Sequence, residues 1–383
     1  MSHFAHLGPF SDFVDAARRS GPVCPLAPPG LETQRRVREA LSFAPGPAEP
    51  QDVAVARAWQ RDGINGQEIS WWVGYGPRTR AWLLRPAGVT GRLPGVVALH
   101  DHGGFKYYGK EKIADGPDET PEMLRPFREV CYGGWAYANA LAREGFAVLV
   151  PDAFLWGSRR FPWDLVSGGR RGECDAARHT AEQIAAYNAD TAAHEHVVEK
   201  YCSVLGTTLA AVVSYEDRVA VGCLASREDV DGDALGCIGL SGGGARSALL
   251  QATCDRIRAA AIVGMMSTYE GLLDHNISCH TWMLFPQGWS RHGDWADLAA
   301  CRAPSPLLVQ YDREDGLFTM AGMEAAHHRL AAHYESVGHP ENYVGRFYPG
   351  PHKFDLEMQG EAFAWLARHL RSSDVRERKH SWK

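Results

Sequence analysis

The chain has 383 residues, 45% of them hydrophobic, which is enough for one large α/β domain with insertions or for two ordinary domains. Its formal net charge is -6, and no run of Lys or Arg forms a basic stripe, so we expect no nucleic-acid partner. No stretch approaches the length of a membrane span, and the amino terminus lacks the cationic start and apolar core of a secretory signal. We therefore expect neither a membrane protein nor a nucleic-acid-binding protein.

The nine cysteines are odd in number, widely spaced and never arranged as C-x-x-C, which favours reduced thiols in a cytoplasmic protein. Two His-x-His patterns occur, at His100–His102 and His194–His196. Because positions i and i+2 of a helix do not share a face, the second pattern predicts a solvated helix surface rather than a metal site. We expect neither a metal nor a cofactor.

Residues 1–50 contain two helix-like pieces, Ser11–Ser20 and Leu31–Phe43. We interpret them as an N-terminal helical extension that packs on the main domain or on a second subunit, so a homo-oligomer is a candidate assembly. Three short β-like runs follow between residues 53 and 84, separated by turn-forming glycines and polar residues. They are typical of antiparallel edge strands.

From residue 94 onward, strand-like and helix-like segments alternate. Apolar runs predict strands at Gly95–Leu99, Phe146–Val150, Ala234–Ile238, Ala259–Val263, Pro306–Gln310 and Tyr343–Tyr348. Helical patterns cover 134–143, most of 181–225, 320–337 and 354–370. This alternation predicts an α/β fold with a mostly parallel sheet covered on both faces and functional residues at the carboxyl ends of its strands. The main domain is predicted to span 51–370, followed by a charged tail at 371–383.

The segment Gly239–Gly243 follows a predicted strand directly and precedes a helix-like run, which matches the G-x-S-x-G elbow. In such an elbow Ser241 occupies the strained tip of the turn and its hydroxyl projects from the sheet. Gly239 and Gly243 lie where a side chain would collide as the helix folds back. The pentapeptide alone also fits a glycine-rich turn with an incidental serine.

A serine nucleophile needs a general base, and His352 lies in a Pro- and Gly-rich loop between the last predicted strand and the last helix. A carboxylate must orient the imidazole, and both Asp312 and Asp315 follow the preceding strand. We favour Asp315, because several loop residues are needed to turn a carboxylate towards the histidine. Asp312 is expected to cap the turn or to pair with Arg313. The order Ser241, Asp315, His352 is the order of an α/β-hydrolase triad.

The developing oxyanion requires backbone donors. One is expected to be the amide of Gly242, which follows the nucleophile at the amino end of the elbow helix. The second is expected from the glycine-containing loop His100–Gly104, with His102 and Gly103 as the candidates. The His-Asp-His sequence could instead be a metal fragment, but the adjoining glycines and the strand end fit an oxyanion loop better.

With these residues in place, the chain resembles the α/β-hydrolase superfamily, and within it the dienelactone-hydrolase-like and acetylxylan-esterase-like branch of serine esterases. The matching pieces are the His100–Gly104 loop, Pro151–Asp152 with Trp156–Arg159, the Ser241 elbow, Asp315 before Gly316–Phe318, and Pro351–Phe354. The resemblance spans roughly residues 93–370 and implies ester hydrolysis. True dienelactone hydrolases have a cysteine nucleophile where this elbow has Ser241, which puts that lactone chemistry in doubt.

The segment 265–301 follows a strand at the catalytic edge and is interpreted as a lid. Trp282, Trp289 and Trp295 would then line an acyl or sugar site, since indole faces suit both. The alternative is a packed structural insertion whose tryptophans are buried. Tyr107, just after the oxyanion loop, is another candidate pocket residue.

The sequence therefore predicts a metal-independent serine carboxylesterase that acts through an acyl-enzyme on a small or medium ester, such as an acetylated sugar. The same triad would also serve a peptidase or amidase, which must protonate a poorer leaving group. A protein of another class, a non-catalytic binding protein that keeps the fold, is the remaining alternative.

Overall fold

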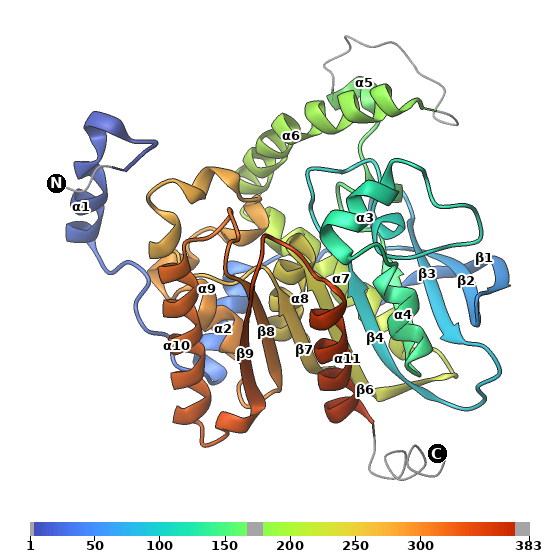
Figure 1. Cartoon of the computed structure of the whole chain (residues 1–383). Coiled ribbons are helices and arrows are strands. Elements are labelled where there is room, and N and C mark those ends of the chain that lie inside the picture. Colours follow the sequence, from blue (N-terminus) through green and yellow to red (C-terminus); the bar gives the residue numbers. More distant parts are fainter. Residues whose placement is uncertain (1–3, 167–178, 372–383) are drawn as a thin grey trace.

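The computed structural model describes residues 4–166 and 179–371 and contains, in those ranges, one nine-stranded sheet (Figure 1). The strands lie in the order β1-β2-β3-β5-β4-β6-β7-β8-β9. Their bounds are β1 Gln51–Arg61, β2 Ile64–Trp72, β3 Thr79–Pro86, β4 Leu93–Leu99, β5 Ala147–Pro151, β6 Val230–Leu240, β7 Ile257–Val263, β8 Leu307–Asp312 and β9 Tyr343–Tyr348. The strands β1, β2 and β3 pair in antiparallel fashion, β3 is also antiparallel to β5, and the strands from β5 to β9 are parallel. The predicted antiparallel edge and parallel centre are confirmed.

Side chains of the central strands alternate between two cores. In β4, Val97 and Leu99 join the core on one face of the sheet, and Val96 and Ala98 join the core on the other. A parallel strand that is buried on both faces must be apolar at every position, because successive side chains point to opposite sides. Continuous apolar runs in the sequence therefore located these strands well.

Helices cover both faces of the sheet (Figure 1). One core is completed by residues of α2 (Leu31–Ala40), α7 (Leu209–Ala225), α8 (Gly242–Thr253), α9 (Trp295–Ala300) and α10 (Met320–Ser336). The other core is completed by residues of α3 (Leu124–Tyr132), α4 (Tyr137–Arg143) and α11 (Leu356–Leu370). The remaining helices are α1 (Asp12–Ser20), α5 (Trp163–Val166) and α6 (Ala181–Val204). Short 3-10 turns are η1 Gly8–Phe10, η2 Lys110–Lys112, η3 Gly157–Arg159, η4 Glu270–Leu272, η5 Asn276–Cys279, η6 Trp282–Leu284, η7 Trp289–Arg291 and η8 Pro340–Asn342.

Two helical features differ from the sequence-based expectation. The helix α3 was not predicted, because Pro126 breaks the helical pattern; it lies in the first turn, where a missing N–H removes no intrahelical bond. The predicted helical region 181–225 is two helices, α6 and α7, bent by 89° at a break that contains Gly206 with φ of 73°. Among the described residues no single helix is long and apolar enough to cross a membrane, and α6 with α7 meets that test only as a bent pair.

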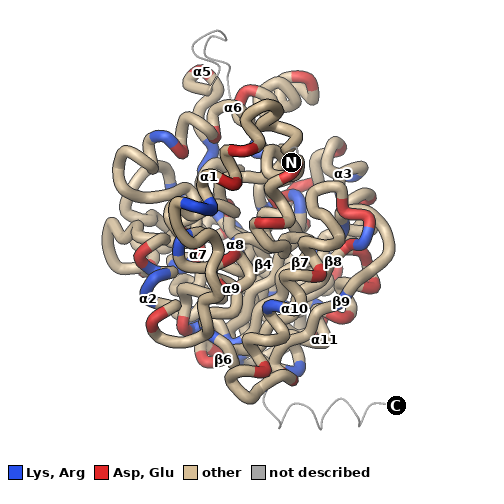
Figure 2. The backbone as a smooth tube through the Cα atoms, turned by 90° about the vertical axis from the view of Figure 1, so that its left-hand side faces the viewer, with Lys and Arg blue, Asp and Glu red and all other residues tan. Residues whose placement is uncertain are grey.

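The N-terminal extension contacts the body in two ways. The helix α2 inserts the fully buried Val37 into the core, whereas α1 projects at the side of the molecule (Figure 1) and its Arg18 donates to Glu270. Figure 2 shows basic and acidic residues interspersed along the tube rather than gathered in one stripe. Eight of the nine cysteines lie in the described ranges and are unpaired, and Cys174 lies outside them. The predicted tail also lies outside the described residues after Arg371.

Candidate active site

The elbow forms where β6 ends and α8 begins. Ser241 has φ of 55° and ψ of -122°, a left-handed conformation that a serine adopts only at a cost in backbone strain. Its amide donates to the carbonyl oxygen of Val263 at 2.9 Å, which fixes the turn against β7. A Cβ on Gly239 would lie 2.5 Å from the carbonyl carbon of Gly243, and a Cβ on Gly243 would overlap the Leu99 oxygen. The turn therefore requires both glycines.

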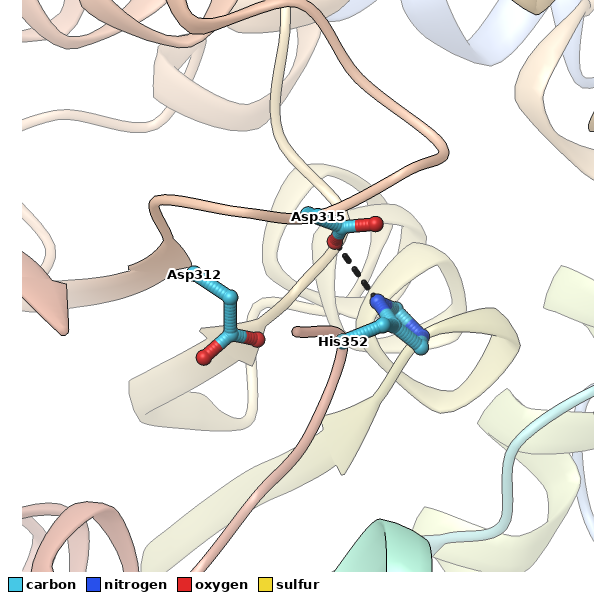
Figure 3. A group of neighbouring side chains, drawn as sticks. All are labelled: Asp312, Asp315 and His352. Carbon is cyan, nitrogen blue, oxygen red and sulfur yellow. Dashed lines mark hydrogen bonds and ion pairs between the residues drawn. The ribbon is translucent and has the colours of Figure 1, made fainter. Parts of the chain in front are cut away.

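His352 and Asp315 are joined by a side-chain hydrogen bond at this edge of the sheet (Figure 3). Asp315 is buried, and its Oδ2 lies 2.7 Å from Nδ1 of His352, while its Oδ1 accepts from the amide of Leu317 at 2.9 Å. Burial alone would lower the pKa of His352, but the hydrogen bond to Asp315 and its negative charge outweigh that effect, so the pKa is raised. The pair therefore favours an imidazole that can accept a proton.

Asp312 lies at the end of β8, close to the imidazole but not hydrogen-bonded to it (Figure 3). Its Oδ2 accepts from the amide of Lys353 at 3.0 Å, not from Arg313 as expected, because the Arg313 guanidinium lies over the ring of Phe347. Its Oδ1 is buried and has no hydrogen-bond partner among the described residues. Burial raises the pKa of Asp312 to about 7. A carboxyl group that is partly protonated at neutral pH is a weaker partner for an imidazolium than Asp315.

The imidazole of His352 packs beside the elbow. A Cβ on Gly264, the residue after β7, would lie 2.9 Å from Cε1 of His352 and 3.0 Å from Cδ1 of Leu240. The ring therefore lies over the strand ends from which Ser241 projects. Its Nε2 is buried without a hydrogen-bond partner among the described residues, so no bond to Ser241 is formed in this state. In unliganded sites the bond between nucleophile and base is often long, and it shortens in the complex with substrate.

The loop after β4 approaches the elbow from the other side. A Cβ on Gly242 would lie 2.6 Å from the backbone nitrogen of His102. A Cβ on Gly103 would instead meet the Asp101 carboxylate and the Phe127 ring. Of the two residues considered for the second oxyanion donor, His102 is therefore the one whose main chain lies against Gly242. Both amides lie near the amino end of α8, where the helix dipole favours negative charge.

Comparisons with known proteins identify the fold that carries this site. No protein-family profile matches the sequence. A Bacillus subtilis (strain 168) protein, YtaP, whose name describes it as a hydrolase, is 23% identical over 266 residues, covering 69% of this chain and 74% of that protein. A Bacteroides fragilis NCTC 9343 protein described as an acetyl xylan esterase superposes with a TM-score of 0.61 at 14% identity, covering 89% of this chain and 82% of its own.

Two further solved structures extend the likeness. The glucuronoyl esterase of Solibacter usitatus has a TM-score of 0.62 at 13% identity, with 89% of this chain and 92% of that chain covered. Acetyl xylan esterase 1 of Thermoanaerobacterium sp. JW/SL YS485 has a TM-score of 0.51 at 14% identity, with 94% and 99% covered. This chain has the α/β-hydrolase fold. The predicted fold is thereby confirmed.

In this α/β-hydrolase fold, buried charges support the loop after β4. Lys112 has no exposed surface, and its ammonium donates to the Asp101 carboxylate at 3.1 Å and to the carbonyl oxygen of His102 at 3.2 Å. Tyr132 donates to the other Asp101 oxygen at 2.5 Å. From the elbow helix, Arg246 bonds to the carbonyl of His100 at 3.3 Å. None of these supports could be predicted from the sequence, because lysine and arginine side chains normally face solvent.

The His194–His196 part of α6, predicted to be a solvated helix surface, is solvated only in part. His196 is exposed and His194 is partly buried, but Glu195 is only 5% exposed. Its carboxylate accepts from Nε2 of His102 at 3.0 Å and from the ammonium of Lys106 at 2.5 Å. The solvated-surface interpretation does not extend to Glu195, because the α6 face that bears this residue turns towards the segment 265–301, where Thr281 and Trp282 donate to it.

The predicted pocket residues do not share one site. Trp289 and Trp295 are 0% and 1% exposed, and their Nε1 atoms donate to backbone carbonyls, so the prediction that Trp289 lines a pocket is wrong. Trp282 is partly exposed and donates through Nε1 to His196 at 2.9 Å. Tyr107 lines a cavity of about 1800 Å³, but none of the described residues lining it is Ser241, Asp315 or His352. Two of the three tryptophans of the segment 265–301 therefore fit the alternative of a packed structural insertion.

One group of described side chains has the composition of a metal site. Potential ligand atoms of Asp312, Asp315 and His352 all lie within 4.8 Å of one another. The Nδ1 of His352 and the Oδ2 of Asp315 are already joined by their hydrogen bond, and Asp312 accepts from a backbone amide. These contacts suit an acid-base pair, and the expectation of a metal-independent enzyme stays a prediction.

Proposed function

We propose that this protein is a serine hydrolase of carboxylic esters that acts through an acyl-enzyme on Ser241. The observation that carries the proposal is the 2.7 Å bond between Asp315 and His352, whose ring lies over the strand ends beside a strained serine elbow. The names of the similar proteins, a hydrolase and several esterases, support the same reaction type.

In the proposed acylation step, three side chains and two backbone amides act together. Nε2 of His352 accepts the proton of the Ser241 hydroxyl as Oγ attacks the ester carbonyl, while Asp315 holds Nδ1–H and stabilises the imidazolium. The amides of Gly242 and His102 donate to the oxyanion of the tetrahedral intermediate. When the intermediate collapses, Nε2 returns its proton to the departing alcohol, and Ser241 remains acylated.

Deacylation repeats these steps with water. His352 removes a proton from the water, hydroxide attacks the acyl carbonyl, and the tetrahedral intermediate again places its charge between the two amides. Its collapse releases the carboxylic acid and returns the proton to Ser241.

We further propose that the substrate is a small or medium ester, with acetylated sugars as the first class to examine. Support comes from the similar structures described as acetyl xylan and glucuronoyl esterases. A panel of p-nitrophenyl esters of increasing acyl length, acetylated sugars and matched anilides tests this assignment. We expect turnover of the short esters and little of the anilides. Preferential turnover of anilides would favour an amidase, and a folded protein inactive on the whole panel would favour a binding protein.

A further inference from the structure

A single buried carboxylate joins three separate segments of the chain. Glu195 of α6 is 5% exposed, and each of its oxygens accepts two hydrogen bonds. Oε2 accepts from Nε2 of His102 at 3.0 Å and from Nζ of Lys106 at 2.5 Å. Oε1 accepts from Oγ1 of Thr281 at 2.6 Å and from the amide of Trp282 at 3.1 Å. An ionised carboxylate only accepts hydrogen bonds, so this arrangement suits its chemistry.

The contact with His102 is directional. The amide of Gly104 donates to Nδ1 of His102 at 3.0 Å, so Nδ1 must be the accepting nitrogen and Nε2 must carry the hydrogen. Glu195 supplies the acceptor that this hydrogen needs. The ring of Trp156 stands edge-on to His102 at 5.0 Å, and its Nε1 donates to the His102 carbonyl at 3.3 Å. Hydrogen bonds therefore hold both the imidazole ring and the backbone carbonyl of His102 in place.

The second half of the carboxylate fixes the segment 265–301. Thr281 donates its hydroxyl to Glu195 and accepts from the amide of Met283 at 3.3 Å, which begins the turn η6. The amide of Trp282 completes the attachment. The same side chain thus connects the loop that approaches Gly242 with the segment 265–301, for which a lid and a packed insertion were both considered.

We propose that Glu195 is a positioning residue that holds the backbone amide of His102 at the oxyanion site and links it to the segment 265–301. The inference rests on the proposed esterase function. A displacement of about 1 Å in such a donor lowers turnover on the order of 100-fold, because the oxyanion is stabilised only in the transition state. The effect of Glu195 is therefore expected in kcat rather than in KM.

The test compares Glu195→Gln with Glu199→Gln, the same change one turn along α6. Glu199 is equally buried, and its oxygens bond to the amide of Leu209 at 2.8 Å and to Gln287 at 3.0 Å, away from the loop after β4. In Glu195→Gln an NH2 group replaces one of the two acceptor oxygens. It faces either the donors of His102 and Lys106 or the donors of Thr281 and Trp282, and those two donors lose their acceptor. We expect kcat, normalised to the fraction of active sites that react with a fluorophosphonate, to fall about 10- to 100-fold in Glu195→Gln. The KM should stay within about threefold of the wild-type value. The Glu199→Gln variant should keep kcat within about threefold.

A double-mutant cycle identifies the route of the effect. If Glu195 acts through the His102 side chain, Glu195→Gln should cost less than about threefold in a His102→Ala background. Thr281→Val removes one of the two bonds between Glu195 and the segment 265–301, together with the acceptor of the Met283 amide, and should lower kcat less than Glu195→Gln does. Should Glu195→Gln fail to fold, Glu195→Asp, which keeps the charge but shortens the reach, replaces it in the same cycle with a smaller expected loss.

The outcomes separate the two proposals. An unchanged kcat in an active, folded Glu195 variant, or a full loss that persists in the His102→Ala background, would overturn the positioning role and leave the esterase assignment intact. Wild-type protein that neither turns over esters nor reacts with a fluorophosphonate would contradict the proposed function itself.

Discussion

The acid-base side and the oxyanion side of the candidate active site are held in place by different kinds of contact. On the acid-base side, the loops after β8 and β9 are joined by backbone bonds, from Arg313 to the Tyr348 carbonyl at 2.9 Å and from Glu314 to the Gly350 carbonyl at 3.1 Å. On the oxyanion side, the loop after β4 is held by the buried side chains of Lys112 and Glu195. Backbone pairing tolerates most sequences, whereas buried charges demand particular partners. Substitutions should therefore affect the two sides differently.

The largest effect is expected where both sides converge on the nucleophile. Ser241→Ala removes the attacking oxygen, and His352→Ala removes its base, so each should lower kcat at least about 10⁴-fold. The strand pairing around the elbow is unaffected, and the thermal midpoint should change little. Steady-state kinetics with a short p-nitrophenyl ester and a melting curve check this. Substantial turnover in either variant would contradict the triad.

The two aspartates test the acid-base side alone. Asp315→Asn loses the charge that orients and stabilises the imidazolium, and we expect kcat to fall about 10³- to 10⁴-fold. Asp312→Asn is the matched control, because its amide oxygen can still accept from Lys353, and we expect a loss of less than about tenfold. Equal losses, or a larger loss at Asp312, would show that the hydrogen bond seen here does not identify the catalytic acid.

The oxyanion side is tested by two buried lysines. Lys112→Met leaves Asp101 without its cation and should lower the free energy of unfolding by about 3 to 5 kcal/mol. Lys110→Met should destabilise to a similar degree, because Lys110 is also buried and paired, with Asp152. Of these two lysines, Lys112 alone donates to the carbonyl of His102, so only Lys112→Met should lower kcat, by about tenfold or more.

Urea unfolding and active-site-normalised kinetics separate stability from turnover in these lysine variants. Similar kcat losses in both would mean that the oxyanion loop responds to general destabilisation rather than to its own support.

The smallest expected effect is a shift in pH dependence. Catalysis needs neutral His352, and its pKa is raised, so kcat/KM should increase with pH through a midpoint above about 6.5. Removing the Asp315 charge removes the main cause that raises this pKa and leaves burial, which lowers it. The residual activity of Asp315→Asn should therefore rise at lower pH than that of the wild type. A shift to higher pH would be inconsistent with this assignment.

The acid-base side could be predicted from the sequence because it depends on element order. Apolar runs locate the strands, and Asp315 and His352 fall in loops after two strands that pair as neighbours, β8 and β9. The elbow is also local, since glycines flank Ser241 within five residues. Register alone then brings these segments together.

The oxyanion side could not be predicted in the same way. Glu195 lies 93 residues from His102 along the chain, and the sequence around it predicts a helix surface that faces solvent. Lys112 lies in a polar loop, where lysine normally faces water, and its burial is a tertiary property that no local pattern reveals. Trp289 shows the same error with an aromatic side chain, because a tryptophan on a predicted lid is equally compatible with exposure and with complete burial.

The most direct test of the central claim is the site of covalent modification. Peptide mass spectrometry after reaction with a fluorophosphonate should find one adduct, on Ser241, in the wild-type protein, and none in Ser241→Ala. Labelling should be slowed strongly in His352→Ala, because the base that activates the hydroxyl is missing. Ester turnover by a wild-type protein that carries no adduct, or an adduct on another residue that abolishes turnover, would contradict the account.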